Sequence, residues 1–360
     1  MGNRGLLFIP DISGFTRFVN ETEIDHSRLI IQELLELLIN ANQIGLEVSE
    51  IEGDAILFYR FGDRSDLAEI YRQVEQMFCK FHSHLNAYDL TRFCQCKACI
   101  SAVSLSLKVI THYGEFTGYN VKNFNKLIGR DIIVAHQLLK NDIIEHEYWL
   151  VTKQLLPGDP PKDLRQWMKW DRGTKQTESG EIGYHYTQLG ELKKEIPPGT
   201  LPQLAISNKI KMLSLSKEYE TDIITLFHAA GDFNYRAMWR EGVKRVEAAN
   251  HFLPRVGMHC KCILEHGEET IYSSGYSFHP DKIEFSETDD RRTWDICYTL
   301  EKAGEKRIRL TIDYYLGRNP LRQFLFGFGK RKRIEAELQR SLENLTDLVK
   351  EIKLPPVTEQ

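Results

Sequence analysis

Residues 8–16 have the sequence FIPDISGFT, and this stretch decides the fold of the first half of the chain. An apolar run that stops at a proline predicts a buried strand followed by a turn, and Asp11 stands at that turn. Apolar residues then recur at helical spacing between Leu29 and Ile39 and predict an amphipathic helix. Two short runs on either side of Gly53 and Asp54 predict a hairpin with these two residues at its tip.

The rest of the first half extends this pattern into an α+β fold. The further elements expected are a helix over 66–90, a strand over 103–112, a helix over 131–139, a strand over 148–151 and a strand over 184–189. The β-α-β-β-α-β order of the first six elements is the ferredoxin-like arrangement. The stretch 157–183 is polar and rich in glycine and proline, and therefore predicts a loop.

A linker is predicted over 196–204, because three prolines and a glycine between Ile196 and Pro202 interrupt both helix and sheet. It separates a first domain (1–195) from a second (205–353), and a short tail (354–360) follows. The second domain is expected to hold a first strand over 205–215, short helices, several alternating strands and a long final helix over 330–352. That helix has one apolar stripe, so we expect it to pack against the sheet.

Composition excludes several classes of protein. The net charge of −4 over 360 residues argues against a general nucleic-acid binder, which needs a basic surface. No apolar run approaches the roughly 20 residues that span a bilayer. The N-terminal apolar stretch is short and lacks a small-residue cleavage site, so we expect a cytoplasmic location. Seven cysteines, an odd number, favour reduced thiols over a disulfide framework.

Four motifs in the first half resemble those of class III adenylyl and guanylyl cyclases. Residues 8–16 resemble the first metal-binding motif of that family and residues 50–58 the second. Residues 108–115 and 129–138 are similar to the segments that follow in it, and the resemblance covers 6–192. It implies a nucleotidyl cyclase-like domain that binds a nucleoside triphosphate with Mg²⁺ or Mn²⁺ and forms a homodimer.

The residue chemistry agrees with such a site. Divalent ions that carry phosphates prefer carboxylate oxygens, and Asp11 and Asp54 would converge if their strands are neighbours. The resemblance assigns the nucleotide to Gly14, Phe15 and Thr16, where backbone N–H groups and a helix N-terminus favour an anion. The alternative is that Asp11 caps the helix and Asp54 serves a tight turn.

Base recognition can also be compared with the family. The two positions at which it recognises the purine hold Glu50 and Lys126 here. A carboxylate accepts from guanine N1–H and the 2-amino group, and an ammonium donates to O6, so this pair favours GTP over ATP. The alternative is an ordinary salt bridge between Glu50 and Lys126.

Catalysis is where the resemblance fails. The family holds its transition state with an Asn and an Arg, and those positions hold Ile133 and Gln137 here. Losing such a contact costs on the order of 10²–10³ in rate. The sequence therefore predicts a degenerate, non-catalytic nucleotide-binding domain. The alternative is an active cyclase or phosphohydrolase that uses Asp11 and Asp54, with a partner chain supplying the missing groups.

Cys94, Cys96 and Cys99 form a CxCxxC cluster outside these motifs. Three thiols at this spacing suit Zn²⁺ or an Fe–S cluster, and a closed site needs a fourth ligand. Cys79, His82 and His84 are close in sequence and would be candidates for it. The alternative is three unrelated cysteines. A third interpretation of the whole chain makes both halves structural, with the cysteine cluster as its only functional centre.

The second half resembles the START-like (SRPBCC) superfamily in residues 238–243, residues 253–260 and the final helix. That resemblance implies a helix-grip fold with an apolar cavity for a small hydrophobic ligand. Its lining would come from Phe233, Tyr235, Trp239, Tyr276 and Trp294, although aromatic residues are more often core. The combination resembles a bacterial family that joins a divergent cyclase domain to a START-like domain, and it suggests a signalling or sensing role.

Overall fold

The computed structural model describes residues 4–22, 24–92, 94, 96–122, 124–161, 164–178, 180–198, 209–248, 256–265, 267–318 and 326–352. The chain forms two compact units, residues 1–89 with 101–199 and residues 90–100 with 200–360. The predicted first domain included segment 90–100, which instead belongs to the second unit. Of the predicted linker, residues 199–204 lie outside the described residues, as do residues 205–208 of the predicted first strand after it.

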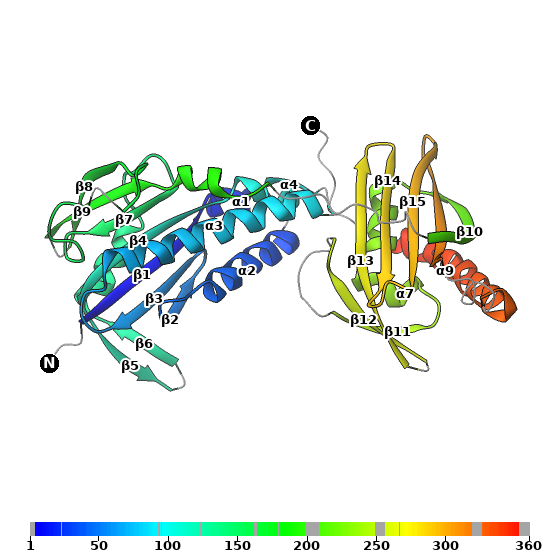
Figure 1. Cartoon of the computed structure of the whole chain (residues 1–360), viewed down its shortest axis with the longest axis horizontal. Helices are drawn as coiled ribbons and strands as arrows, with labels where there is room; N and C mark the ends of the chain where they lie inside the picture. Colours follow the sequence, from blue (N-terminus) through cyan, green and yellow to red (C-terminus); the bar gives the residue numbers. More distant parts are fainter. Residues whose placement is uncertain are drawn as a thin grey trace. The chain divides into compact units, whose positions relative to one another are not determined.

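The first unit is built on a seven-stranded sheet in the order β2-β3-β1-β4-β7-β9-β8 (Figure 1). Its strands are β1 (Arg4–Ser13), β2 (Glu47–Glu52), β3 (Ala55–Phe61), β4 (Ser106–Glu115), β7 (Tyr148–Thr152), β8 (Trp170–Thr177) and β9 (Gly180–Gln188), and a separate ribbon pairs β5 (Thr117–Val121) with β6 (Phe124–Ile128). Its main helices are α1 (Phe15–Glu21), α2 (Ile24–Asn40), α3 (Leu67–Thr91) and α5 (Arg130–Leu138), and short 3₁₀ turns lie at Ala102–Ser104 and Gly190–Glu195. From β1 to β4 the chain follows the predicted β-α-β-β-α-β order.

Helix α5 covers one face of this sheet. Leu7 and Ile9 are alternate residues of β1, and they join one buried cluster with three residues of α5, Val134, Ala135 and Leu138. This follows from the two-residue period of a strand, which puts alternate side chains on one face. Asp11 follows Ile9 by two residues, so it lies on the same face of the sheet as Leu7 and Ile9, which is the face that α5 covers.

The predicted loop over 157–183 is wrong in its second half, because β8 and the start of β9 pair there as an antiparallel hairpin. Strand β8 lies at the edge of the sheet and has the pattern WDRGTKQT, with no buried residue. An edge strand that faces solvent needs no apolar side chains. The same reason explains why the exposed β5–β6 ribbon was not predicted.

The second unit is a second seven-stranded sheet, all antiparallel, in the order β10-β16-β15-β14-β13-β12-β11. Its strands are β10 (Lys209–Glu220), β11 (Val243–Ala248), β12 (His259–Leu264), β13 (Gly267–His279), β14 (Lys282–Asp289), β15 (Trp294–Gly304) and β16 (Arg307–Gly317). Its helices are α4 (Lys97–Ser101, with Ser101 itself in the first unit), α6 (Ile223–Gly231), α7 (Arg236–Trp239) and α9 (Arg331–Glu351), with a 3₁₀ turn at Phe233–Tyr235 and a π turn at Phe326–Lys330. The predicted final helix is therefore present.

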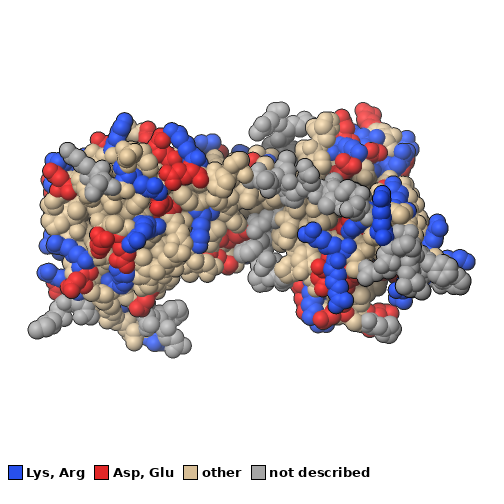
Figure 2. Space-filling view, in the orientation of Figure 1, with Lys and Arg blue, Asp and Glu red and all other residues tan. Residues whose placement is uncertain are grey.

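Helix α9 packs through the stripe that its sequence predicted. Leu338, Leu342 and Leu345 are fully buried and join Tyr298 and Leu300 of β15 in one cluster. Burying each such leucine contributes roughly 1.5–3 kcal/mol. The two units together give the chain the α+β class expected of it. On the visible face of each unit, basic and acidic side chains are intermixed (Figure 2).

Candidate functional site

The first predicted metal carboxylate, Asp11, lies on β1, and the second, Asp54, lies in the turn that leads into the neighbouring strand β3. Asp11, near the end of β1, pairs in register with Ala55, the first residue of β3. The Ile12 amide donates to the Asp54 carbonyl over 3.0 Å. Asp11 is only 7% exposed, whereas Asp54 is partly exposed at the hairpin tip. The chain therefore brings these two residues together at one end of the sheet, as the hairpin prediction required.

A lysine that the sequence analysis did not single out completes this group. Lys108 of β4 stands directly opposite Asp11 in the β1–β4 register, and its Nζ lies 3.4 Å from Asp11 Oδ1. The same ammonium donates to the Leu139 carbonyl over 3.4 Å. Only cross-strand pairing brings Lys108 to this place, and no local pattern in the sequence marks it.

Charge at this end of the sheet is unbalanced. Burial raises the pKa of Asp11 to about 6, with Lys108 opposing the rise and the Asp54 carboxylate adding to it. The pKa of Asp54 is also raised, chiefly by burial. Two carboxylates thus share one ammonium, and the Asp54 carboxylate disfavours ionisation of Asp11. A divalent cation would relieve that repulsion.

The predicted nucleotide-binding turn lies beside the hairpin tip. Gly14 has φ of 89°, in the left-handed region that favours glycine, and it directly precedes α1. A Cβ placed on Gly53 would lie 3.7 Å from Cε1 of Phe15, so that ring is next to the hairpin tip. Gly14 and Thr16 are exposed. Their role toward a nucleotide stays a prediction.

Glu50 of β2 and Lys126 of β6 form an ion pair. His136 of α5 lies between two carboxylates, with Nε2 3.4 Å from Glu50 Oε1 and Nδ1 3.4 Å from Glu52 Oε2. The pair therefore makes the salt bridge that the sequence analysis left open as its alternative. Recognition of guanine by the same two side chains stays a prediction.

Helix α5 is anchored to β4 by a polar chain. The Asp131 carboxylate accepts from the Glu115 amide over 2.6 Å and lies 3.0 Å from His112 Nε2, while His112 Nδ1 lies 2.9 Å from Thr152 Oγ1. A Cβ on Gly114 would come within 2.2 Å of Asp131, so only glycine fits there.

This anchor fixes Ile133 and Gln137, which the sequence resemblance aligns with the Asn and Arg of the cyclase family. Ile133 is 52% exposed, and Gln137 is half-buried. The Gln137 Oε1 atom is buried and has no hydrogen-bond partner within the described part of the chain. Neither side chain can donate as a guanidinium does.

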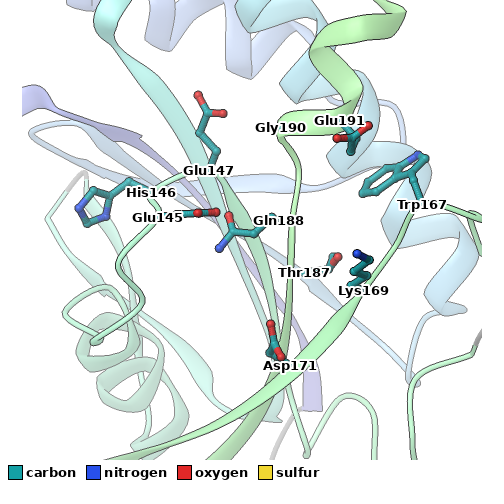
Figure 3. A pocket seen from close by; sticks show the side chains of 10 residues that line it. All are labelled: Glu145, His146, Glu147, Trp167, Lys169, Asp171, Thr187, Gln188, Gly190 and Glu191. Atoms are coloured by element: carbon teal, nitrogen blue, oxygen red, sulfur yellow. The ribbon is translucent and has the colours of Figure 1, made fainter.

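A cleft of about 770 Å³ opens at the same end of the sheet (Figure 3). Figure 3 shows Glu145, Glu147 and Gln188 on one side of it and Trp167 and Lys169 on the other. The sequence analysis did not predict this cleft, because its lining comes from the ends of three strands.

Glu147 connects this cleft to a buried histidine. Its carboxylate accepts from the Ser106 hydroxyl over 2.7 Å, pairs with Lys193 and lies 3.9 Å from His82 Nε2. Burial and the nearby Lys193 lower the pKa of His82 to about 4, although the Glu147 carboxylate opposes the fall.

The predicted pocket aromatics of the second unit lie in or against its core. Trp239 is fully buried and Phe233 is 6% exposed. Tyr235, Tyr276 and Trp294 are half-buried and pack against the main cluster. A hollow of about 980 Å³ on this unit is lined by other residues, from 220–224, 280 and 302–308. Lining of a ligand cavity by the five aromatics stays a prediction.

A buried ion pair lies next to Trp239. The Arg236 guanidinium pairs with both oxygens of Glu287, and the Tyr298 hydroxyl donates to the same carboxylate over 3.1 Å. Burial alone would lower the pKa of Arg236, but the Glu287 carboxylate raises it overall. The guanidinium also lies over the rings of Phe233 and Trp239.

The three cysteines of the CxCxxC cluster converge in the second unit. The Sγ atoms of Cys94, Cys96 and Cys99 lie within 4.8 Å of one another, so the chain holds a cluster that could bind a metal ion. The two histidines among the predicted fourth ligands have other partners in the first unit. His84 Nε2 lies 2.9 Å from Glu33 Oε1, and His82 faces Glu147. Each of the seven cysteines, all within the described ranges, is a thiol without a disulfide.

The family model that matches this chain lies mainly within the first unit. Residues 31–148 match a family described as "Protein of unknown function (DUF2652)". An uncharacterised protein of Mycobacterium tuberculosis is 32% identical over 120 residues, which are 33% of this chain and 56% of that protein. The chain thus matches only about half the length of this curated relative.

Similar solved structures include class III nucleotidyl cyclase domains. A bacterial light-regulated adenylyl cyclase is 15% identical over 54% of this chain and 98% of its own, with a TM-score of 0.38. A guanylate cyclase domain from Catenaria anguillulae, in complex with GTP, is 13% identical over 52% and 96%, with a TM-score of 0.35. The adenylyl cyclase CyaB from P. aeruginosa is 16% identical over 52% and 94%, with a TM-score of 0.34.

Within the described ranges, no helix has the length and apolar character that a membrane span requires.

Proposed function

We propose that the first unit binds a nucleoside triphosphate together with Mg²⁺ or Mn²⁺ and does not cyclise it. The observation that carries this proposal is the pair of carboxylates at one end of the sheet, Asp11 on β1 and Asp54 in the turn before the neighbouring strand β3. Burial is the main cause of the raised pKa values of both carboxyl groups, and the Asp54 carboxylate adds to the rise at Asp11. Perturbed carboxyl groups of this kind are typical of functional sites.

The carboxylate pair fits a hard divalent cation, since such ions take one or two carboxylates and complete their shell with phosphate and water. The bound ion would neutralise phosphate charge beside Gly14. Lys108 competes for the same place, because its ammonium already lies 3.4 Å from Asp11. The site should therefore bind the metal more weakly than two unopposed carboxylates would.

The absence of cyclisation rests on α5. Ile133 and Gln137 hold the positions that the cyclase family uses for transition-state contacts, and neither offers a charged donor. We expect GTP in preference to ATP, because Glu50 and Lys126 match the hydrogen-bonding edge of guanine once they separate to admit the base.

Thermal unfolding with and without ligand tests the metal and nucleotide. Manganese with GTP should raise the melting temperature, since a ligand at about 100 times its Kd adds about 2.7 kcal/mol to stability. The double variant Asp11→Asn with Asp54→Asn should lose the shift. Asp63→Asn with Asp142→Asn removes the same two charges from exposed positions and should keep it. An unchanged melting curve for the unmodified protein at millimolar ligand refutes the proposal.

A product assay separates binding from catalysis. The unmodified protein should make negligible cyclic nucleotide from GTP or ATP, and Ile133→Asn with Gln137→Arg restores the groups found in the family. Any activity gained by that variant would support the assignment of these two positions. Robust synthesis by the unmodified protein would instead establish an active cyclase. Equal shifts with ATP and GTP would leave Glu50 and Lys126 as an ordinary ion pair.

The first unit is further proposed to form a homodimer. Tyr119, Val121 and Ile128 of the β5–β6 ribbon and Val48 and Ile51 of β2 are large apolar residues, each between 42% and 57% exposed. An exposed apolar patch of this kind is typical of a protein interface, and two copies would bury it around a twofold axis. Val121→Glu with Ile128→Glu should give a monomer in analytical ultracentrifugation.

The matched control for the dimer is Ile144→Glu, which adds a charge at another exposed apolar residue. It should leave the assembly unchanged. A monomeric unmodified protein at micromolar concentration contradicts the homodimer.

For the second unit we propose a helix-grip, START-like fold that binds an apolar small molecule, so that the whole chain acts as a sensor. A single antiparallel sheet with a long amphipathic C-terminal helix packed on it supports this proposal. Binding of an apolar fluorescent probe to the variants Trp239→Ala and Tyr276→Ala tests this proposal. Tyr276→Ala, at the edge of the core, should reduce binding of an apolar fluorescent probe, whereas unchanged probe binding in both variants would contradict an aromatic-lined cavity.

A further inference from the structure

The strongest unassigned feature of the second unit is the segment that carries Cys94, Cys96 and Cys99. A turn forms here because the Ile100 amide donates to the Cys96 carbonyl over 3.0 Å, which starts α4 and brings Cys99 back toward Cys96. The Cys96 amide donates to the Cys94 sulfur over 3.4 Å. Such an N–H···S bond stabilises negative charge on sulfur, which a thiolate ligand requires.

A histidine far away in the sequence faces the same cluster. Nε2 of His228, on α6, lies 3.6 Å from the Cys94 sulfur, although 134 residues separate the two. Both residues belong to the second unit. Around a tetrahedral zinc ion with Zn–S of about 2.3 Å and Zn–N of about 2.0–2.1 Å, two such ligand atoms are about 3.6 Å apart. The observed separation therefore matches two ligands of one ion.

We propose that Cys94, Cys96, Cys99 and His228 hold a structural Zn²⁺ ion. Three thiolates and one imidazole are a closed tetrahedral set for zinc. A single ion accounts for sulfur atoms within 4.8 Å of one another. A [4Fe–4S] cluster places each protein ligand on a different iron atom, and a [2Fe–2S] cluster places only two on each iron, so the four ligands of either cluster are spread more widely than those of a single ion.

The ion would join two distant parts of the second unit. Segment 90–100 belongs to this unit although the flanking residues belong to the first. Besides the sulfur contacts, it is held by the Val256 amide, which donates to the Thr91 carbonyl over 3.2 Å. A link from this segment to α6 closes a long loop, and such links restrict the unfolded chain most.

Metal analysis of the full-length protein, purified under reducing conditions, tests the site without any nucleotide. We expect about one zinc ion per chain. Cys96→Ser and Cys99→Ser should weaken binding at least about tenfold, since even a lost supporting contact costs 10–100-fold. Cys79→Ser and Cys297→Ser replace two other half-buried thiols and should retain the metal. A chelator should lower the melting temperature of the unmodified protein and of these two controls.

Cobalt substitution then tests His228 itself. Co²⁺ added to the metal-free, reduced protein should give the visible bands of a tetrahedral thiolate site. His228→Ala should weaken binding and shift those bands, whereas His228→Cys should restore affinity and strengthen the sulfur-to-cobalt absorption. Full affinity and an unchanged spectrum in His228→Ala would refute the histidine ligand. Absence of zinc in the native protein, together with no cobalt spectrum, would refute the whole site. Neither result bears on Asp11 and Asp54, because nucleotide-dependent stabilisation is measured separately.

Discussion

Each unit of this protein buries a basic side chain against a carboxylate, but the charges balance differently in the two. In the second unit Arg236 meets Glu287 with both oxygens engaged, and both side chains are almost fully buried. In the first unit Lys108 meets Asp11 at 3.4 Å, and the Asp54 carboxylate adds a further negative charge. The first pair is closed and neutral, whereas the second group is open and in excess of negative charge.

This difference indicates what each group does. A bidentate, neutral pair with Tyr298 as an extra donor leaves no net charge for a ligand, so we interpret it as part of the core. Two carboxylates at a sheet end, one of which disfavours ionisation of the other, gain free energy when a cation arrives. The same elementary interaction thus serves stability in one unit and, we propose, binding in the other.

The largest effect is expected from breaking the closed pair. Glu287→Gln leaves the buried Arg236 charge unmatched and should cost about 3–5 kcal/mol of unfolding free energy. Adding Arg236→Met should recover much of that loss, because it removes the stranded charge while the introduced amide oxygen can still accept from Tyr298. Urea unfolding followed by circular dichroism measures both variants.

The control for this pair is Glu284→Gln, on the same strand but partly exposed and paired with the exposed Lys282. It should change stability by less than about 1 kcal/mol. If Glu287→Gln behaved like this control, the pair would not be the closed structural element described above.

The next effect concerns pH and the buried His82 of the first unit. The pKa of His82 is lowered to about 4 in the folded state from 6.5, so the unfolded state binds an extra proton between these pH values. The contribution of neutral His82 to stability should therefore be fully present above pH 6.5. The unfolding free energy should fall by about 2–3 kcal/mol as the pH drops to 4. In His82→Gln this fall should be reduced. Equal pH profiles for the two proteins would contradict a buried neutral His82.

A smaller effect, on metal affinity, is expected from removing the Lys108 ammonium that lies beside Asp11 in the first unit. Lys108→Met removes the ammonium beside Asp11 and should tighten Mn²⁺ binding about tenfold above the pKa of Asp11, where both carboxylates are ionised. Lys140→Met removes the same charge from an exposed position just after α5 and should leave the Kd unchanged. Isothermal titration with Mn²⁺ measures both, and weaker binding in Lys108→Met would mean that the lysine supports the site.

The smallest effect is expected at the partly exposed Glu50–Lys126 pair. Lys126→Met should barely change the melting temperature, since surface ion pairs contribute little and are screened by salt. The same variant should reduce the preference for GTP over ATP. A large loss of stability without any change in nucleotide preference would favour a purely structural salt bridge.

Much of this architecture follows from local sequence patterns. The strand that ends at Asp11, the hairpin tip at Gly53 and Asp54, and the apolar stripe of α9 each depend on periodicity or turn chemistry within a few residues. The β8 strand and the β5–β6 ribbon were missed, because exposed edge strands carry polar residues that resemble those of a loop. The assignment of segment 90–100 to the second unit was missed for another reason, since it depends on contacts with residues more than a hundred positions away.

The sequence by itself determined the α+β class, the positions of Asp11, Asp54 and the CxCxxC cysteines, and the absence of Asn and Arg at positions 133 and 137. Tertiary structure alone decided which side chains contact Asp11 and the CxCxxC cysteines. Lys108 reaches Asp11 through the β1–β4 register, and His228 reaches Cys94 across 134 residues. The physical reason is that periodicity and turn propensity act over a few residues, whereas strand register and the packing of distant helices are fixed by the core as a whole.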